Sequence, residues 1–557
     1  MGKLLFQILL IFASIFWLSG WTEPNWSENA PIPIGGRENI YQMSDSEWAE
    51  SVRQGRLHAL HYPIETTGII LPLRALNALF ETDDSNPIRW FLKQLFRDFN
   101  AINSFDDLEA WIGLNEYPEE ESVEIPFLNH QRPSHRMGFT ILKAHGTQGF
   151  TISCAQCHSA NLFGTRVLGL TNRFSRANEY FVKGKQTLKF VTENRFRWFT
   201  QASPEEIDLF VRAKENMNYV GVKSPIQLGL DTSLAQVSLS LARREQDNYA
   251  SKNPYWTQHP RMEKLETFVA DSKPAVWWNL KYKTRWLSDG SVISGNPIFT
   301  NFLWNEIGRG SDLMELEGWL EANADKVREL TAAVFSTQAP RYFDFFEATE
   351  EHLISAKRGY QVYQKTCAKC HGVYLKGWML PNGEQLPVLQ QLETTLVDYR
   401  QPTPVMNVGT DPQRYLGMSS LEPLNDLVIS QKAGVRIQVQ NGYVPPPLVG
   451  IWARWPYFHN NSIPNLCELL KPANKRVRGF YMGEAQDKEK DFDSQCNGYP
   501  VGKNVPQAWK MRREYYFFTR RPGSSNIGHD KGIFVIDGKN QLDEGMRQDL
   551  IRFLQTL

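Results

Sequence analysis

The chain has 557 residues, more than a single hydrophobic core usually serves, and this length predicts two or three domains. Hydrophobic residues make up 41% of it and aromatic residues 12%, a composition that excludes intrinsic disorder. Lys plus Arg and Asp plus Glu both number 61, so no excess of positive charge indicates nucleic acid or an anionic membrane as a partner.

The first 20 residues have the pattern of a secretory signal. Lys3 precedes an apolar run from Leu4 to Leu18, and Gly20 stands near the expected cleavage point. The run is long for a signal and Leu18 suits a cleavage site poorly, so an uncleaved N-terminal anchor is the alternative. We therefore expect a periplasmic or secreted protein that contacts the membrane only if this segment is retained.

Helical signals follow in chain order after a stretch rich in Pro and Gly that favours an extended arm. Apolar residues three and four apart, with acidic residues or Pro at the start, predict helices over residues 87–99, 105–114, 204–216, 311–335 and 348–366. The best strand signal is 532–536. The predicted fold class is therefore mainly α, with long Pro- and Gly-rich loops and little β structure.

Four of the six cysteines belong to two copies of the pattern Cys-x-x-Cys-His. The copies are Cys154, Cys157 and His158, and Cys367, Cys370 and His371. Thiols three residues apart lie on nearly one face of a helical turn, where both can bond to one porphyrin edge and the next imidazole can bind its iron. A thioredoxin-like redox pair or a structural zinc site is the alternative. Because the pattern occurs twice in a chain with few cysteines and an export signal, we expect two covalently bound c-type haems.

The two patterns mark a coarse internal repeat, which predicts two tandem cytochrome c-type domains. We expect an N-terminal extension of unknown role over 21–135, a first domain with haem 1 over 136–340, and a second with haem 2 over 341–557. The junction lies near 338–340, and the helix over 348–366 opens the second domain.

The remaining metal-ligand and thiol residues lead to two further expectations. Met406, Met418, His459 and His529 are rival sixth ligands of haem 2 because they follow its motif in the chain. Cys467 and Cys496 are expected to form a disulfide, since an exported chain meets oxidising conditions.

Four segments carry a resemblance to a known family. Residues 444–470 (VPPPLVGIWARWPYFHNNSIPNLCELL) resemble a segment of the bacterial di-haem cytochrome c peroxidase and MauG superfamily. Residues 274–283 (PAVWWNLKYK), 408–415 (VGTDPQRY) and 525–532 (SNIGHDKG) resemble, more narrowly, its rubber oxygenase (RoxA-type) branch. With both motifs the likeness spans roughly 140–557, and two features depart from the family: the long span between the motifs, and Cys467.

The resemblance implies a mainly α fold with two cytochrome c domains that face each other. It implies that His158 is the proximal ligand of a reactive haem 1 and His371 that of a low-spin haem 2. His529 matches the distal ligand of haem 2 in the rubber oxygenase branch. Trp277 and Trp278 match a tryptophan that lies between the haems, although core packing explains either one equally well.

His459 matches a family position near the haem interface that is not generally an iron ligand. We therefore expect it to act beside the haem, together with Tyr457 and Asn460.

Two functions remain in competition. The favoured one is an oxidoreductase that activates peroxide or dioxygen at haem 1, with a redox partner protein or a small-molecule oxidant as its partner; the alternative is an electron carrier with both irons six-coordinate. The region 280–303 resembles the distal pocket of the rubber oxygenase branch, with Val292, Ile293, Ile298, Phe299 and Phe302 as its expected apolar wall. Met217 and His259 are the nearest alternatives that could close the site.

Overall fold

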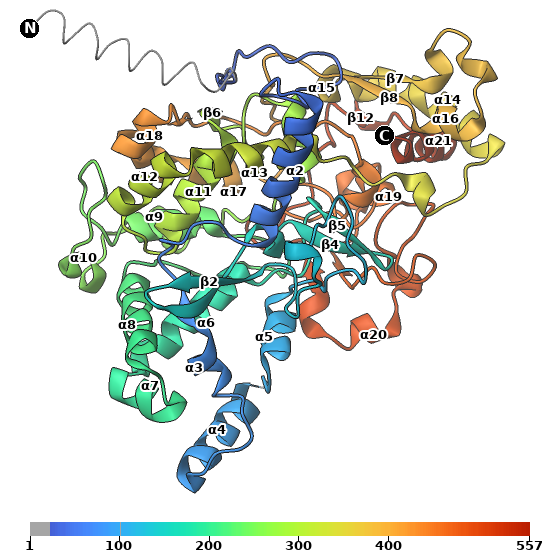
Figure 1. Ribbon diagram of the computed structural model, residues 1–557. Helices are drawn as coiled ribbons and strands as arrows, with labels where there is room; N and C mark the ends of the chain where they lie inside the picture. The colour runs from blue at the N-terminus through green and yellow to red at the C-terminus, as the bar shows by residue number, and fades with distance from the viewer. Residues whose placement is uncertain (1–22, 101) are drawn as a thin grey trace, which may run out of the picture.

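The computed structural model describes residues 23–100 and 102–557 (Figure 1). The expected signal over 1–20 lies outside the described residues. Within them, no helix has both the length and the apolar character that crossing a membrane requires.

Helices supply most of the regular structure, and the strands are short. The α-helices are α2 (Asp45–Leu60), α3 (Leu73–Asn77), α4 (Pro87–Asn100), α5 (Phe105–Ile112), α6 (Ala177–Phe190), α7 (Glu193–Thr200), α8 (Pro204–Asn218), α9 (Ser233–Leu241), α10 (Pro254–Gln258), α11 (Pro297–Gly308), α12 (Leu313–Ala322), α13 (Ala324–Ser336), α14 (Glu350–Thr366), α15 (Ala368–His371), α16 (Val388–Glu393), α17 (Gln413–Gly417), α18 (Val428–Lys432), α19 (Leu466–Leu469), α20 (Gln507–Lys510) and α21 (Glu544–Gln555). The strands are β1 (Leu71–Pro72), β2 (Phe139–Ala144), β3 (Thr147–Ile152), β4 (Ser159–Leu162), β5 (Thr165–Leu168), β6 (Val292–Ser294), β7 (Val373–Lys376), β8 (Thr395–Asp398), β9 (Arg436–Ile437), β10 (Gly479–Tyr481), β11 (Tyr516–Phe518), β12 (Val535–Ile536) and β13 (Lys539–Asn540). Among the 3-10 turns, η2 (Cys154–Gln156) and η4 (Trp277–Tyr282) matter for the site.

The helices predicted over 87–99, 105–114, 204–216 and 348–366 are confirmed as α4, α5, α8 and α14. The single helix predicted over 311–335 is wrong in one respect, because Asn323 divides it into α12 and α13. The Asn323 side chain donates to the Trp319 carbonyl at 2.8 Å and its backbone leaves helical geometry (φ −126°, ψ 37°).

The strand predicted over 532–536 shrinks to β12, since a turn takes its place. The amides of Ile533, Phe534 and Val535 all donate to the Asp530 carbonyl, which holds the backbone in a turn rather than a ladder. The apolar pattern of the sequence does not reveal that a turn can replace strand pairing at this place.

The N-terminal extension packs directly on the segment that carries the first motif. β1 pairs with β3 in the antiparallel sheet β1-β3-β2, with Leu71 opposite Phe150. α2 lies against α13 (Figure 1), where Gly55 is so close that a Cβ there would lie 1.9 Å from the Glu329 carbonyl oxygen. These contacts join the extension to the fold, and the boundary at 135 stays a prediction.

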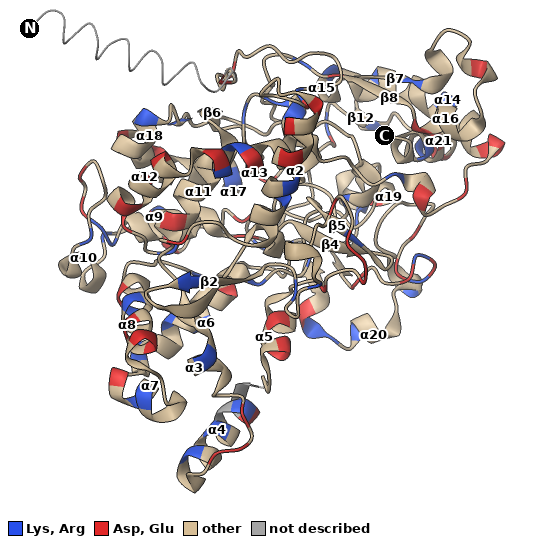
Figure 2. Ribbon diagram, in the orientation of Figure 1, with Lys and Arg blue, Asp and Glu red and all other residues tan. Residues whose placement is uncertain are grey.

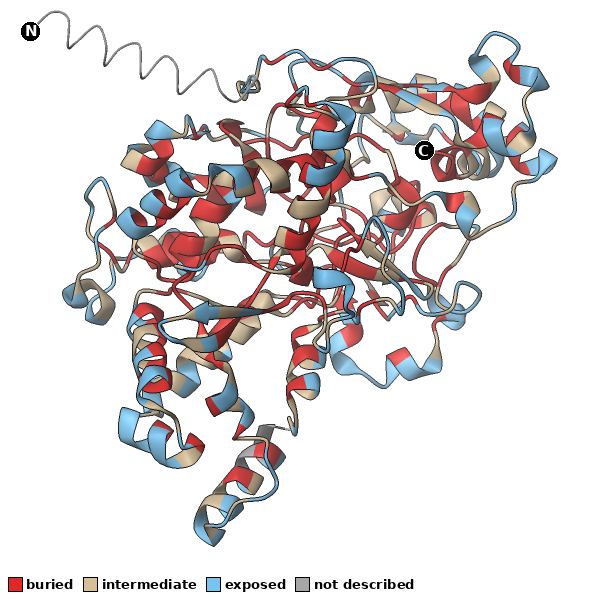
Figure 3. Cartoon of the chain, viewed as in Figure 1, coloured by how far each residue is buried: buried red, intermediate tan, exposed pale blue. Residues whose placement is uncertain are grey.

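Two hydrophobic cores lie side by side in the body of the molecule, whose buried residues Figure 3 marks in red. The N-terminal core draws mainly on residues 59–335 and takes in Met418–Ile437 from the second half. The C-terminal core draws mainly on 342–557, where α14 packs on α21. Trp277 belongs to the first core and its neighbour Trp278 to the second, so this dipeptide links them.

Charges of both signs are interspersed along the ribbon (Figure 2). This fits the equal numbers of basic and acidic residues and gives no single-sign face in the view drawn.

Candidate haem site

One cavity of about 480 Å³ is lined by both Cys-x-x-Cys-His motifs, although more than 200 residues separate them in the chain. All four motif cysteines line it. So do four histidines, namely His158, His371, His459 and His529.

The first motif follows a strand. β3 ends at Ile152, and η2 turns the chain so that the amides of Cys157 and His158 both donate to the Cys154 carbonyl, at 3.2 and 3.0 Å. Ser153 fixes the turn from outside, because its hydroxyl donates to the Ala59 carbonyl of α2 at 2.8 Å. The extension therefore helps to position the first motif.

The second motif follows a helix. α14 runs into Cys367, whose amide donates to the Tyr363 carbonyl at 2.8 Å, and the His371 amide donates to the Cys367 carbonyl at 3.0 Å. Gly372 then ends this turn with φ +85°, a conformation that glycine adopts without strain.

The motif cysteines form no disulfide, and burial alters their acidity. It raises the pKa of Cys154 to about 11, of Cys157 to about 12 and of Cys367 to about 11. A thioredoxin-like pair needs a thiol with a lowered pKa. These environments therefore disfavour the redox-pair alternative.

His371 and His529 face each other across the cavity. Their rings are nearly parallel, 19° apart in orientation and 6.2 Å between centroids. Two metal–imidazole bonds of about 2 Å put the nitrogens about 4 Å apart, with each centroid roughly 1 Å further back, so this gap suits one iron. The Nδ1 atom of His371 lies 2.8 Å from the Pro446 carbonyl oxygen, which leaves its Nε2 free to bind metal.

His158 has different surroundings. Its ring neighbour is Trp277, at 5.5 Å and tilted by 40°, and the backbone of Ala275 acts on it as a hydrogen-bond partner. Two backbone hydrogen bonds through Gly169 hold His158 and Trp277 together. The Gly169 amide donates to the His158 carbonyl at 2.7 Å, and the Trp277 amide donates to the Gly169 carbonyl at 3.0 Å.

Burial keeps all four cavity histidines neutral near pH 7. It lowers the pKa of His158 and of His371 to about 4, and that of His459 and of His529 to about 3. A neutral imidazole is the form that binds a metal.

The two tryptophans flank the cavity without lining it. Trp278 is fully buried and its indole N–H donates to the Val449 carbonyl at 2.8 Å. Trp277 contacts His158 as described. Their expected role between the haems stays a proposal.

His459 has a partner that sequence reasoning missed. Its ring stacks on Tyr443 at 4.1 Å, and its Nε2 lies 3.1 Å from the Tyr443 hydroxyl. The expected partners bond elsewhere: Tyr457 to Asn497, and Asn460 to the carbonyls of Gly523 and Ser525.

The expected apolar distal wall is wrong, since none of Val292, Ile293, Ile298, Phe299 and Phe302 lines the cavity. α11 turns its other face inward, and Asn301, Trp304 and Asn305 line the cavity at helical spacing. The alternatives Met217 and His259 do not line it either; Met217 packs in a small cluster with Ile152 and Phe181, and His259 lies against Tyr255.

The rival ligands of haem 2 separate by position. Met406 lines the cavity together with His529, whereas Met418 is buried in the N-terminal core and does not line it. His529 is held from both sides, since its amide donates to the Val408 carbonyl at 3.0 Å and Phe458 stacks on its ring at 5.4 Å.

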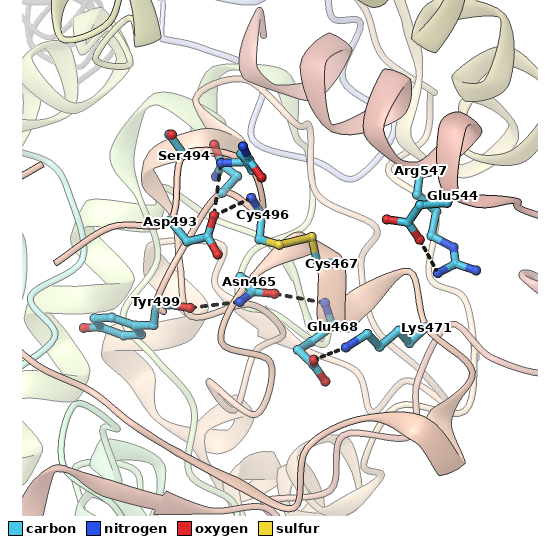
Figure 4. The surroundings of a disulfide bond; sticks show 12 residues. Asn465, Cys467, Glu468, Lys471, Asp493, Ser494, Cys496, Tyr499, Glu544 and Arg547 are labelled. Carbon is cyan, nitrogen blue, oxygen red and sulfur yellow. Dashed lines mark hydrogen bonds and ion pairs between the residues drawn. A yellow bond between two sulfur atoms is a disulfide. The ribbon is translucent and has the colours of Figure 1, made fainter. Parts of the chain in front are cut away.

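The expected disulfide is confirmed between Cys467 and Cys496 (Figure 4). The Leu466 amide also donates to the Cys496 carbonyl at 2.8 Å, and Asp493 accepts from the Cys496 amide at 2.9 Å. The bridge joins α19 to the turn over 494–497 beside the C-terminal core.

The residues present fit c-type haem. Each motif offers two free thiols and a buried neutral imidazole beside one shared cavity. Among the described residues, the Nδ1 atom of His529 is also buried without a hydrogen-bond partner, so no hydrogen bond at that atom fixes the orientation of this imidazole.

One comparison with known families bears on this chemistry. Residues 442–481 match the family described as RoxA-like, cytochrome c-like. The chain is 34% identical over 125 residues to the uncharacterized protein y4iJ of Sinorhizobium fredii, and 37% identical over 124 residues to the uncharacterized protein y4iM of the same organism. These alignments cover 22% and 21% of this chain, and 19% and 27% of the two relatives. Residues 442–481 are thus similar to a RoxA-like cytochrome c domain, and such a domain implies covalently bound haem iron.

Proposed function

We propose that the protein is an exported di-haem c-type cytochrome, an oxidoreductase in which peroxide or dioxygen is activated at haem 1 and haem 2 transfers electrons. Cys154, Cys157 and His158 would hold haem 1; Cys367, Cys370, His371 and His529 would hold haem 2. The observation that carries the proposal is the unequal surroundings of His158 and His371.

Haem 2 fits electron transfer because His371 and His529 would both hold it. His371 and His529 are parallel across a gap that suits one iron. An iron with both axial positions filled exchanges electrons without binding an oxidant, and imidazoles held by Pro446 and Phe458 limit reorganisation.

Haem 1 fits oxidant binding because, among the described residues, no second imidazole contacts the ring of His158. The only ring contact of His158 within the described residues is Trp277. A haem with an open position supplies one-electron and oxygen chemistry when bound. His459 does not fill that position in this arrangement, since its Nε2 is engaged by Tyr443.

Trp277 and Trp278 would connect the two haems. Trp277 lies beside His158, and Trp278 lies in the C-terminal core that surrounds the second motif. Adjacent buried indoles give a path for electrons between the cores. The donor would be a redox partner protein, and the export signal over 1–20 would place the reaction in the periplasm or the medium.

The test is to count haems and their spin states in the purified protein. A pyridine haemochrome assay should give two c-type haems per chain, and electron paramagnetic resonance should give one low-spin and one high-spin ferric signal. Two low-spin signals would favour the electron carrier instead, and one haem per chain would refute the di-haem assignment.

A further inference from the structure

The cavity between the motifs is lined by an excess of buried cations. Five basic side chains line it against the single carboxylate of Asp231; the five are Lys273, Lys283, Arg309, Arg414 and Arg454. Two of them have carboxylate partners, because Arg309 lies 3.8 Å from Glu306 and Arg414 lies 3.2 Å from Asp289. Three cations therefore line the cavity without an ion-pair partner among the described residues.

These three cations differ in how the protein satisfies them. Lys273 donates to the carbonyls of Arg454 and Pro456, at 3.0 and 2.5 Å, and Arg454 donates to the Pro447 carbonyl at 2.9 Å. The Lys283 ammonium has no hydrogen-bond or ion-pair partner among the described residues, although the residue is only 7% exposed. A buried ammonium without a partner is unfavourable, so an anion bound beside Lys283 would stabilise this site.

Lys283 and Arg454 belong to the side of the cavity that holds the second motif. Arg454 bonds to Pro447, and the adjacent Pro446 carbonyl accepts from His371. The positive charge of Arg454 acts on both Lys283 and His371. Burial is the largest cause that lowers the pKa of Lys283, to about 8, and the charge of Arg454 is the second. The same charge contributes to the lowered pKa of His371.

The backbone of Lys283 is fixed from two sides. Its amide donates to the Leu280 carbonyl at the end of η4 at 3.1 Å, and Arg37 of the N-terminal arm donates to its carbonyl at 2.5 Å. The arm therefore covers the segment that carries Lys283. This lysine is held in place by its backbone and is not an ordinary surface lysine.

We infer that Lys283, together with Arg454, binds a propionate carboxylate of haem 2. This inference rests on the proposed di-haem function and names the anionic end of the haem pocket. A haem carries two propionates, so two haems would bring four carboxylates into a cavity that has three cations without an ion-pair partner among the described residues. An ammonium beside a propionate neutralises its charge and favours the reduced, less positive iron. Lys283 is then a positioning residue that raises the reduction potential of haem 2.

The test compares Lys283→Gln with Lys283→Arg and with the control Lys281→Gln. Lys281 is also buried, but it is bonded to Glu38 and Gln338 and does not line the cavity. Spectroelectrochemical titration of the low-spin haem should show a tenfold shift of its redox equilibrium toward the oxidised form in Lys283→Gln, about 59 mV for one electron. Lys283→Arg and Lys281→Gln should stay close to the wild type.

Four outcomes decide the assignment. A tenfold shift in Lys283→Gln that Lys283→Arg restores supports it. Two haems with an unchanged midpoint in Lys283→Gln overturn it while leaving the di-haem function intact. A midpoint that responds to added inorganic phosphate in the wild type but not in Lys283→Gln shows that Lys283 binds a free anion, which also overturns it. A wild type with fewer than two haems refutes the proposed function itself.

Discussion

The two motifs have the same five-residue pattern and different settings. The first follows a strand and places a tilted tryptophan beside His158. The second follows α14 and gives His371 a carbonyl partner and a parallel imidazole. The pattern predicts haem binding; under the proposed function, distant residues such as Trp277, Pro446 and His529 would set what each iron can do.

Removing the His529 imidazole should leave each haem site with a single histidine ligand. In His529→Ala we expect the low-spin signal of haem 2 to be lost and the number of exogenous ligands bound per chain to rise from one to two, because one face of haem 2 is opened. Electron paramagnetic resonance with a cyanide titration measures both. Met406→Ala is the matched control, since Met406 lines the same cavity. If the signal survives in His529→Ala and disappears in Met406→Ala, the ligand assignment is wrong.

The disulfide belongs to the second half alone. Replacing Cys467 and Cys496 by Ser together should lower the free energy of unfolding by about 3 kcal/mol through the freed loop. Thermal unfolding followed at the haem absorption band measures this, while the haem count should not change. Free thiols titrated at these positions in the unreduced, denatured wild type would contradict the bond.

His352 anchors α14, the helix that leads into the second motif. Burial lowers its pKa to about 4, while in the unfolded chain it is about 6.5. The unfolded state therefore binds more protons between these values, so stability is complete above pH 6.5 and falls as the pH drops toward 4. Between pH 7 and pH 5 the loss is about 2 kcal/mol.

The matched variant for this prediction is His352→Gln, whose side chain can still donate to the Arg552 carbonyl that His352 contacts at 3.0 Å. Denaturant unfolding at pH 7 and pH 5 should show a smaller acid loss in the variant. An equal loss in both proteins would assign the acid sensitivity to other groups.

Gly169 connects His158 to Trp277, and a side chain there should loosen the first site. Gly169 has φ +89°, and a Cβ would lie 2.9 Å from Thr337 and 3.2 Å from Trp277. Gly164 has a similar φ of +91° and open space around it. Gly169→Ala should therefore cost about 1 kcal/mol more than Gly164→Ala, from overpacking added to the same backbone strain. Equal unfolding midpoints for the two variants would show that Trp277 is not tightly held.

The sequence revealed those features that depend on local pattern. The disulfide was predicted because only two cysteines lie outside the motifs and an exported chain meets oxidising conditions. Apolar periodicity and helix start signals predicted α4, α5, α8 and α14. The motifs indicated haem from their spacing, as the match over 442–481 supports.

Features that depend on three-dimensional packing could not be predicted from the sequence. The inward face of α11 is polar at Asn301 and Asn305 because its apolar residues are needed in the N-terminal core, and a hydrophobic run does not say which face meets the cavity. Tyr443 meets His459 only through the fold. A clue was available, since Tyr443 directly precedes the segment 444–470 that carries the resemblance.

The most direct test of the asymmetry is a titration with cyanide and carbon monoxide, each followed at both haems in the ferric and ferrous states. The account predicts one ligand bound per chain, with only the haem held by His158 changing its spectrum and the haem between His371 and His529 unaffected. Unchanged spectra in both redox states would contradict it and identify an electron carrier. Ligand binding at the haem of His371 would also contradict it.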